Sequence, residues 1–479
     1  MVFSSPIFLF LFLPVVLTVY FLLPGIRSKN LWLLLASLVF YAWGEVCFVF
    51  LLLASAVMNY ALGLWIGRSE IPRQRKLAVA VSVAINIGIL SVFKYADFVV
   101  NSLNSISHLH IPAPKISLPI GISFFTFHAL SYAIDIYRRK WAPAKDPKDT
   151  ALYIFFFPQL IAGPILRWNA IAPQLLHREF RLEVFAEGVR RFVGGLARKM
   201  IIANAVALPA DQIFALSPDQ LSPATAWFGI LCYTLQIYFD FSGYSDMAVG
   251  LGKMFGFTFI ENFQLPYISQ SIREFWRRWH ISLSTWFRDY VYIPLGGNRV
   301  PEWRNRLNLV IVFFLCGLWH GASWTFVVWG FYHGFFLVAE RTRWGVILEK
   351  LPRPFRHFYA VMAVMMGWVL FRANTFPAAA HYFAALAGFG HSEHAQPLAR
   401  FAGNESLWAL GFGILFSFLE WNQLKEFCRR RAGKLPGLPG MIVVNLGRVA
   451  EIAIILAALL ISAAWLAGGT YNPFIYFRF

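Results

Sequence analysis

Apolar runs long enough to cross a membrane follow one another along almost the whole chain of 479 residues. A helix rises about 1.5 Å per residue, so roughly 17–25 apolar residues span the hydrocarbon core of a bilayer. The pattern predicts passes at residues 3–23, 224–251, 358–371, 407–419 and 441–466, and two short passes between residues 27 and 68 separated at Gly44-Glu45. We therefore expect an all-α polytopic membrane protein with roughly 10–12 transmembrane or re-entrant helices, together with interfacial amphipathic helices.

Two segments do not fit a simple succession of passes. Residues 178–199 mix arginines with apolar side chains at helical spacing, which predicts a helix that lies on the cytoplasmic face and does not cross the membrane. Residues 307–339 lie between two basic clusters, but they are too few to cross twice comfortably. This run is either a broken or re-entrant pair that turns near Gly321 or one long tilted helix.

Composition and charge agree with a membrane protein and set its orientation. Hydrophobic residues make up 58% of the chain and charged residues 14%, which leaves too little polar surface for a soluble protein of this size. The net charge of +18 comes from clusters between the apolar runs, as the positive-inside rule predicts, and no nucleic-acid-binding motif accompanies it. The rule places residues 138–148 in the cytoplasm, and the N-terminus and residues 211–220 outside.

The chain shows no sign of a second domain or of a metal site. We find no internal repeat or flexible linker, so residues 1–479 are expected to form a single membrane domain. The four cysteines are scattered without a CxxC pair, and such spacing predicts neither a disulfide framework nor bound metal.

One histidine lies deep within an apolar run. In the sequence Trp319-His320-Gly321, the imidazole is about 20 Å along a helix that starts near one membrane face, which corresponds to the middle of a bilayer. An ionisable side chain at that depth is costly and indicates a function. A neutral histidine bonded to a backbone carbonyl of a neighbouring helix would also fit, and position alone does not separate the two interpretations.

Residues 272–290 predict a single amphipathic helix. Its apolar face includes Trp279, and its polar face consists of Arg273, Arg277, His280, Ser284 and Arg288. Such a helix can anchor the protein at the membrane interface with arginines among the lipid headgroups. Alternatively, the polar face lines a cytoplasmic entrance where arginines bind phosphates and the histidine reaches inward.

Two carboxylates and one irregular segment also lie in apolar surroundings. Asp240 and Asp246 belong to the run 224–251, where unpaired carboxylates would be costly. We expect them to pair with arginines or hydroxyls of residues 272–290 in a structural role. Residues 157–164 contain two prolines and a glycine, and an irregular backbone at membrane depth needs burial in protein or against a cavity.

Together these motifs resemble the alginate O-acetyltransferase branch of the bacterial membrane-bound O-acyltransferases. The resemblance rests on residues 1–5, 121–124, 134–138, 157–164, 239–246, 267–272, 275–286, 288–290, 294–299 and 319–322. It is best over residues 115–372 and weakens after them. It implies that His320 is catalytic and that His280 is a second residue of the site. The side chains then expected in structural or accessory roles are Asp240, Asp246, Trp279, Ser284 and Trp319.

The resemblance also implies a funnel through a ring of tilted helices in the bacterial cytoplasmic (inner) membrane. Acetyl-CoA would approach from the cytoplasm as a thioester donor, with its phosphates near Arg273, Arg277 and Arg288, and no bound cofactor or metal is implied. The acceptor would be an exopolysaccharide such as alginate or cellulose, reached through an extracytoplasmic acetyltransferase or acetyl-carrier protein. Because a thioester is already activated, a neutral buried histidine that deprotonates a hydroxyl in a dry site suffices.

Three other functions remain open at this point. D-alanyl transfer to teichoic acid from a carrier-protein thioester would use the same fold and histidines, and only the preferred donor separates it. A secondary transporter could use buried acidic and histidine side chains as a substrate or proton path, although no inverted repeat is visible. A structural scaffold for polysaccharide export would leave the histidines unexplained.

Overall fold

The computed structural model describes residues 1–107, 110–389, 394–419, 426–427, 430–431, 438–469 and 471–475, and every regular element among them is helical. The elements up to residue 214 are η1 (Phe8–Phe12), α1 (Leu13–Leu22), α2 (Gly25–Ala42), α3 (Phe48–Arg68), α4 (Pro72–Ser107), α5 (Ile122–Tyr137), α6 (Pro147–Phe155), α7 (Phe157–Leu160), α8 (Trp168–Leu176), α9 (Leu182–Ala197), η2 (Arg198–Ala203) and α10 (Asn204–Phe214). The later elements are η3 (Pro218–Gln220), α11 (Pro223–Met254), η4 (Pro266–Ile268), α12 (Ile272–Arg278), α13 (Ile281–Phe287), η5 (Arg288–Tyr292), α14 (Glu302–His320), α15 (Trp324–Ala339), α16 (Arg343–Lys350), α17 (Arg353–Arg372), α18 (Phe376–Leu386), η6 (Leu398–Arg400), α19 (Asn404–Phe418) and α21 (Leu438–Ala467).

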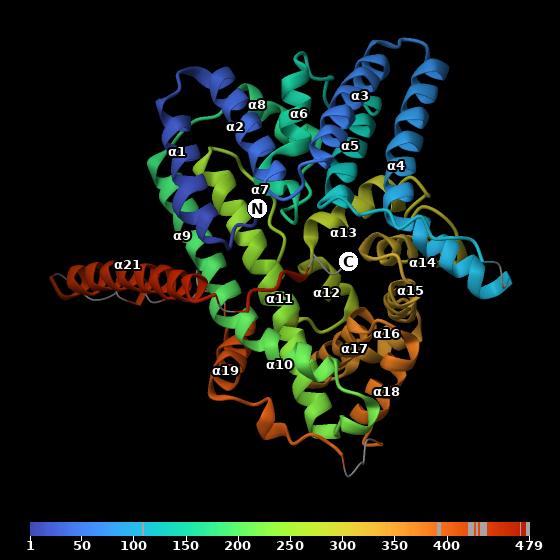
Figure 1. The fold of residues 1–479 in the computed structure, drawn as a ribbon, viewed down its shortest axis with the longest axis vertical. Helices are drawn as coiled ribbons and strands as arrows, with labels where there is room; N and C mark the ends of the chain where they lie inside the picture. The colour runs from blue at the N-terminus through green and yellow to red at the C-terminus, as the bar shows by residue number, and fades with distance from the viewer. Residues whose placement is uncertain are drawn as a thin grey trace.

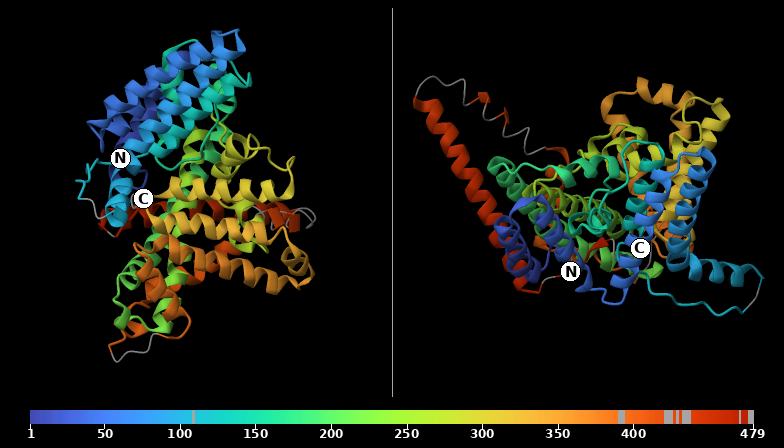
Figure 2. Two further views of the ribbon diagram at one scale, coloured as in Figure 1. Left: turned by 90° about the vertical axis from the view of Figure 1, so that its right-hand side faces the viewer. Right: turned by 90° about the horizontal axis from the view of Figure 1, so that it is seen from above.

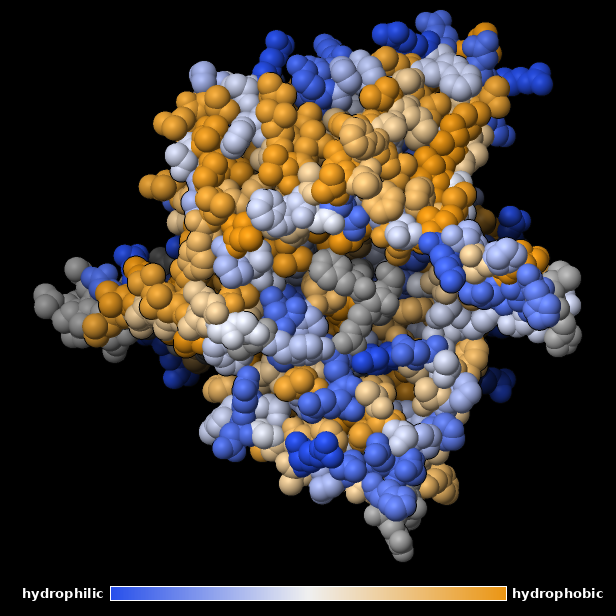
Figure 3. All heavy atoms as spheres, viewed as in Figure 1, coloured by the Kyte–Doolittle hydropathy of each residue, from blue (hydrophilic) through white to orange (hydrophobic). Residues whose placement is uncertain are grey.

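The prediction of an all-α polytopic membrane protein is confirmed. Five helical stretches of the described residues are long and apolar enough to cross a membrane: Phe48–Arg68, Pro72–Ser107, Leu182–Phe214, Arg353–Arg372 and Asn445–Ala467. Shorter apolar helices at Phe8–Leu22 and Trp324–Ala339 accompany them. In Figure 3 apolar side chains form a broad band over the upper part of the molecule, where α1 to α5 lie in Figure 1, and hydrophilic side chains border it.

The helices α9 and α11 pack side by side through the middle of the molecule (Figure 1). Glycines make this approach possible, because a Cβ on Gly195 would lie 2.5 Å from the carbonyl oxygen of Gly243, and one on Gly188 would lie 2.7 Å from that of Gly250. Small residues at such positions let membrane helices approach closely. We call these four residues the glycine interface.

The helix expected on the cytoplasmic face at residues 178–199 is part of a longer helix in the structure. Its helical part, α9, continues without a break through η2 into α10, so that Leu182–Phe214 is one helical stretch with the length and hydropathy of a membrane span. Three of its arginines, Arg190, Arg191 and Arg198, pair with carboxylates of neighbouring segments. The amphipathic pattern arises because one side of α9 packs on α11 through the glycine interface.

The alternatives for residues 307–339 are resolved in favour of a broken pair. The helices α14 and α15 are separated at residues 321–323 and pack against each other as a hairpin. A Cβ on Gly317 would lie 2.3 Å from the carbonyl oxygen of Phe326, and one on Gly330 would lie 2.3 Å from that of Phe313. His320 is therefore the last residue of α14, next to the turn, and does not lie inside one continuous helix.

The far part of the chain returns to the centre of the molecule. The helix α21 projects from the body in Figure 1 and in the right-hand view of Figure 2, whereas residues 471–475 run back beside α11. Asn472 donates to the carbonyl oxygen of Ser4 at 2.9 Å and accepts from Asn204 at 3.2 Å. Residues 471–475, which we call the tail segment, thereby join the N-terminal region to α10.

Candidate functional site

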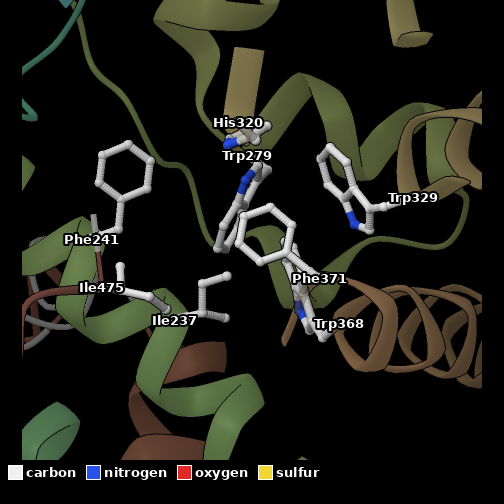
Figure 4. Close-up of a pocket in the computed structure, with 8 residues that line it drawn as sticks. All are labelled: Ile237, Phe241, Trp279, His320, Trp329, Trp368, Phe371 and Ile475. Carbon is white, nitrogen blue, oxygen red and sulfur yellow. The ribbon is translucent and has the colours of Figure 1, made fainter. Parts of the chain in front are cut away.

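His320 forms part of the wall of a narrow cavity at the centre of the helices (Figure 4). Its ring centroid lies 5.1 Å from that of Trp329 and 5.2 Å from that of Phe371, and both rings stand roughly perpendicular to the imidazole. The side chain is 6% exposed. In the described part of the chain its buried Nδ1 atom has no hydrogen-bond partner. An enclosed imidazole of this kind can accept a proton from a hydroxyl that enters the cavity.

The cavity joins segments that are far apart in the sequence. It is lined by Ile237, Phe241, Trp279, His320, Trp329, Trp368, Phe371 and Ile475, which come from α11, the α12–α13 junction, α14, α15, α17 and the tail segment. Apart from the imidazole and the indole N–H groups, this lining is apolar. A thioester carbonyl in such a site would be shielded from water, which favours transfer to another acceptor over hydrolysis.

Sequence reasoning placed two of these lining residues in the site and missed most of the others. Trp279 and His320 were predicted site residues, whereas Trp329, Trp368 and Phe371 were not singled out. Aromatic residues in apolar runs are usually core or lipid-facing, so the spacing in the sequence gave no signal for them. Trp319 lies next to the cavity, with its ring centroid 4.9 Å from that of His320 and 5.9 Å from that of His280.

The predicted single helix at residues 272–290 is wrong, because the chain breaks at His280. This residue has φ +43° and ψ +55°, a left-handed conformation that ends α12 and precedes α13. The break turns the imidazole away from the predicted polar face and buries it fully, 4.6 Å from the ring of Phe241. Both ring nitrogens of His280 are buried without a hydrogen-bond partner among the described residues.

Asn262 holds the break in place. Its backbone carbonyl accepts from the N–H of Ile281 at 2.9 Å, and its side-chain oxygen accepts from the N–H and the hydroxyl of Ser282 at 3.2 and 2.9 Å. These contacts satisfy N–H groups at the start of α13. The Ser282 hydroxyl in turn accepts from the N–H of Ile165, which belongs to the irregular segment after α7. This segment is buried in protein, as predicted for residues 157–164.

The partners predicted for the two carboxylates are also wrong. Asp240 pairs with Lys199 of η2, and Asp246 pairs with Arg191 at 2.8 Å and with Arg198 at 2.5 Å. None of these partners lies in residues 272–290. The reason is the glycine interface, which brings α9 and η2 within reach of α11. The predicted structural role of the two carboxylates remains a prediction.

The buried pair of Lys199 and Asp240 also binds the tail segment. Lys199 donates to the carbonyl oxygen of Pro473 at 2.8 Å, and Asp240 accepts from the N–H of Ile475 at 2.7 Å. The ring of Phe474 lies 4.5 Å from that of Tyr244. Main-chain contacts to an ion pair thus place Ile475 in the wall of the cavity that contains His320.

The three arginines predicted to bind donor phosphates do not form one polar face. Arg273 donates to the carbonyl oxygen of Glu340 at 2.9 Å, Arg277 is exposed, and Arg288 is exposed and paired with Asp289 at 2.6 Å. Burial raises the pKa of Asp289, but the hydrogen bond from Arg288 and the charge of Arg167 outweigh it and hold this pKa below its usual value. Ser284 makes a long hydrogen bond, 3.4 Å, to the carbonyl oxygen of Trp279.

Comparison with known proteins shows the family. The model of the membrane-bound O-acyltransferase (MBOAT) family matches residues 142–377. A protein of Azotobacter vinelandii named "Probable alginate O-acetylase AlgI" is 49% identical over 81% of this chain and 79% of its own length. A Pseudomonas putida protein of the same name is 43% identical over the full length of both chains. A Helicobacter pylori peptidoglycan O-acetyltransferase is 36% identical over 79% of this chain and 78% of its own length. The chain therefore belongs to the membrane-bound O-acyltransferase family and is an O-acyltransferase.

Proposed function

We propose that this protein transfers acetyl groups from acetyl-CoA toward an exopolysaccharide, with His320 as the general base. The observation that carries the proposal is the position of His320 at the wall of a narrow, mostly apolar cavity in a chain of this family. Residues 1–479 act as one membrane domain in this account. The domain lies in the bacterial inner membrane and carries a funnel that gives the donor access from the cytoplasm.

The chemistry requires little more than positioning and one base. The oxygen of the acceptor hydroxyl attacks the thioester carbonyl carbon while an imidazole nitrogen of His320 takes the hydroxyl proton. The carbon–sulfur bond then breaks, and the imidazolium returns the proton to the thiolate of coenzyme A, which leaves as the thiol. General-base assistance of this kind contributes on the order of 10²–10⁴ in rate.

The second histidine and the aromatic lining support this step without taking the proton. The ring of Trp319 lies near both imidazoles, 4.9 Å from that of His320 and 5.9 Å from that of His280. We assign His280 the role of shaping the cavity. The rings of Trp279, Trp329 and Phe371 exclude water from the thioester. Of the three arginines predicted to bind the donor, Arg277 and Arg288 are exposed and able to meet its phosphates.

Alginate is the acceptor that we propose first. Relatives that are 49% and 43% identical carry the name of an alginate O-acetylase. Another relative is named a peptidoglycan O-acetyltransferase. The names therefore agree on acetyl transfer and differ in the polymer that is acetylated. Transfer would proceed through an extracytoplasmic acetyltransferase or acetyl-carrier protein that receives the group on the far side of the membrane.

The test supplies the two competing donors to the same membranes. Inverted vesicles that contain the chain would enclose alginate together with the extracytoplasmic proteins of the native host. They would receive radiolabelled acetyl-CoA or radiolabelled D-alanyl carrier protein. We expect label from acetyl-CoA to reach the enclosed polymer, and we expect no label from the D-alanyl carrier protein to reach it. Label from the D-alanyl donor alone would overturn the proposal and favour teichoic acid chemistry.

A further inference from the structure

The helix that presents His320 ends at the cavity, and its last carbonyl groups need partners. The final four carbonyl oxygens of any α-helix have no partner within the helix. In α14 these belong to residues 317–320. The carbonyl oxygen of Gly317 accepts from the N–H of Gly321 at 3.3 Å. The remaining three accept hydrogen bonds from another part of the chain.

Two consecutive residues of α4 satisfy these three carbonyl oxygens. The hydroxyl of Tyr95 donates to Leu318 at 2.7 Å, and the ammonium group of Lys94 donates to Trp319 and, at 3.4 Å, to His320. The third contact of Lys94 is the hydroxyl of Ser123 at 3.2 Å. The end of α14 is therefore capped in full by its own turn and by one turn of α4, which lies beside it in Figure 1.

The charge of Lys94 fits this position. A helix C-terminus carries partial negative charge, so a cation there is favourable. The ammonium group also lies 5.9 Å from the centre of the Trp319 ring, within the range of a cation–π contact. A lysine within a membrane-spanning helix is costly and indicates a function. Here it is directed at the backbone of the residue that we assign as the base.

We infer that Lys94 and Tyr95 are positioning residues of the acyl transfer, which hold the last turn of α14 so that the His320 imidazole keeps its place in the cavity. The inference rests on the proposed function of His320. Helix ends fray when their carbonyl groups lack partners. A misplacement of about 1 Å at the reacting group can cost on the order of a hundredfold in rate. Loss of the cap should therefore lower kcat and leave donor binding unchanged.

The test compares substitutions in α4 of the full-length protein in vesicles. Lys94→Met should lower kcat for acetyl transfer by about ten- to a hundredfold with the KM for acetyl-CoA unchanged. Lys94→Arg, which keeps the charge and the donor groups, should restore part of the rate. Tyr95→Phe removes one hydroxyl and should lower kcat by about two- to tenfold, the equivalent of one hydrogen bond. Lys76→Met is the matched control, because this lysine lies in the same helix and is exposed.

A double substitution separates positioning from general stability. If Lys94 acts through His320, then Lys94→Met should cause no further loss in a His320→Ala background. If Lys94→Met lowers kcat by the same factor in the unsubstituted protein and in His320→Ala, the inference is overturned. The inference is also overturned if Lys94→Met and the Lys76→Met control have the same kcat. If Lys94→Met does not accumulate in membranes, the loss of kcat caused by Tyr95→Phe is compared in the unsubstituted protein and in His320→Ala instead. If His320→Ala keeps its activity, the proposed function is refuted. If His320→Ala is inactive and Lys94→Met has normal activity, only the positioning role of Lys94 is refuted.

Discussion

Breaking the buried ion pair between α11 and η2 should destabilise the protein strongly. The side chains of Lys199 and Asp240 are 1% and 2% exposed. Lys199→Met would leave the Asp240 carboxylate buried beside the N–H of Ile475 without its counter-charge. Removing one partner of a buried pair costs about 3–5 kcal/mol. An unfolding entropy of about 2.1 cal/mol/K per residue gives about 1 °C per kcal/mol for 479 residues, so the Tm should fall by about 3–5 °C.

The assay is thermal unfolding of the purified protein in detergent, followed by tryptophan fluorescence. The control is Lys253→Met, because Lys253 and Glu187 form an ion pair between α11 and α9, the helix that continues into η2, with 19% and 54% exposure. A partly exposed pair contributes about 0–1 kcal/mol, so this Tm should change little. Replacing both buried partners, Lys199→Met with Asp240→Asn, should recover much of the loss. Equal Tm values for Lys199→Met and Lys253→Met would refute the reasoning.

Three further predictions concern packing, topology and the donor. Gly195→Ala should lower stability by about 1–3 kcal/mol, because the new Cβ would lie 2.5 Å from the carbonyl oxygen of Gly243. Gly194→Ala is the control and should leave stability unchanged, because open space surrounds Gly194. Equal Tm values for the two variants would contradict the role of the glycine interface. Cysteines introduced into residues 138–148 should react with impermeant reagents only from the cytoplasmic side, and labelling from outside would reverse the orientation. Arg277→Ala should raise the KM for acetyl-CoA by removing an exposed charge from the predicted entrance, and an unchanged KM would favour the interfacial-anchor interpretation.

The sequence predicted the positions of several helices well because their signal is local. The N-terminal pass, the two passes separated at Gly44-Glu45 and the pass at residues 224–251 correspond to η1 with α1, to α2 with α3, and to α11. A run of apolar residues needs no knowledge of its neighbours to be assigned to the bilayer. The burial of residues 157–164 was predictable for the same reason, since prolines and a glycine in an apolar run require protein around them.

The failures all involve contacts between distant segments. A periodicity of about 100° per residue cannot show that His280 adopts a left-handed conformation, because the contacts that hold this break come from Asn262, Ser282 and Ile165. The partners of Asp240 and Asp246 were misassigned because the close approach of α9 to α11 depends on glycines, which carry no hydrophobic signal. Lys94 was visible in the sequence as a charge in an apolar run, and asking which helix end it caps would have drawn attention to it.

The central claim is that His320 is the base, and acetyl transfer by His320→Ala tests it most directly. Transfer and thermal unfolding would be measured together on the unsubstituted protein, His320→Ala and His280→Ala. We predict that His320→Ala unfolds at a near-normal temperature and transfers acetyl groups on the order of 10²–10⁴ times more slowly. A stable His320→Ala enzyme with near-normal transfer would contradict the claim, and an inactive His280→Ala enzyme beside it would assign the role of base to His280.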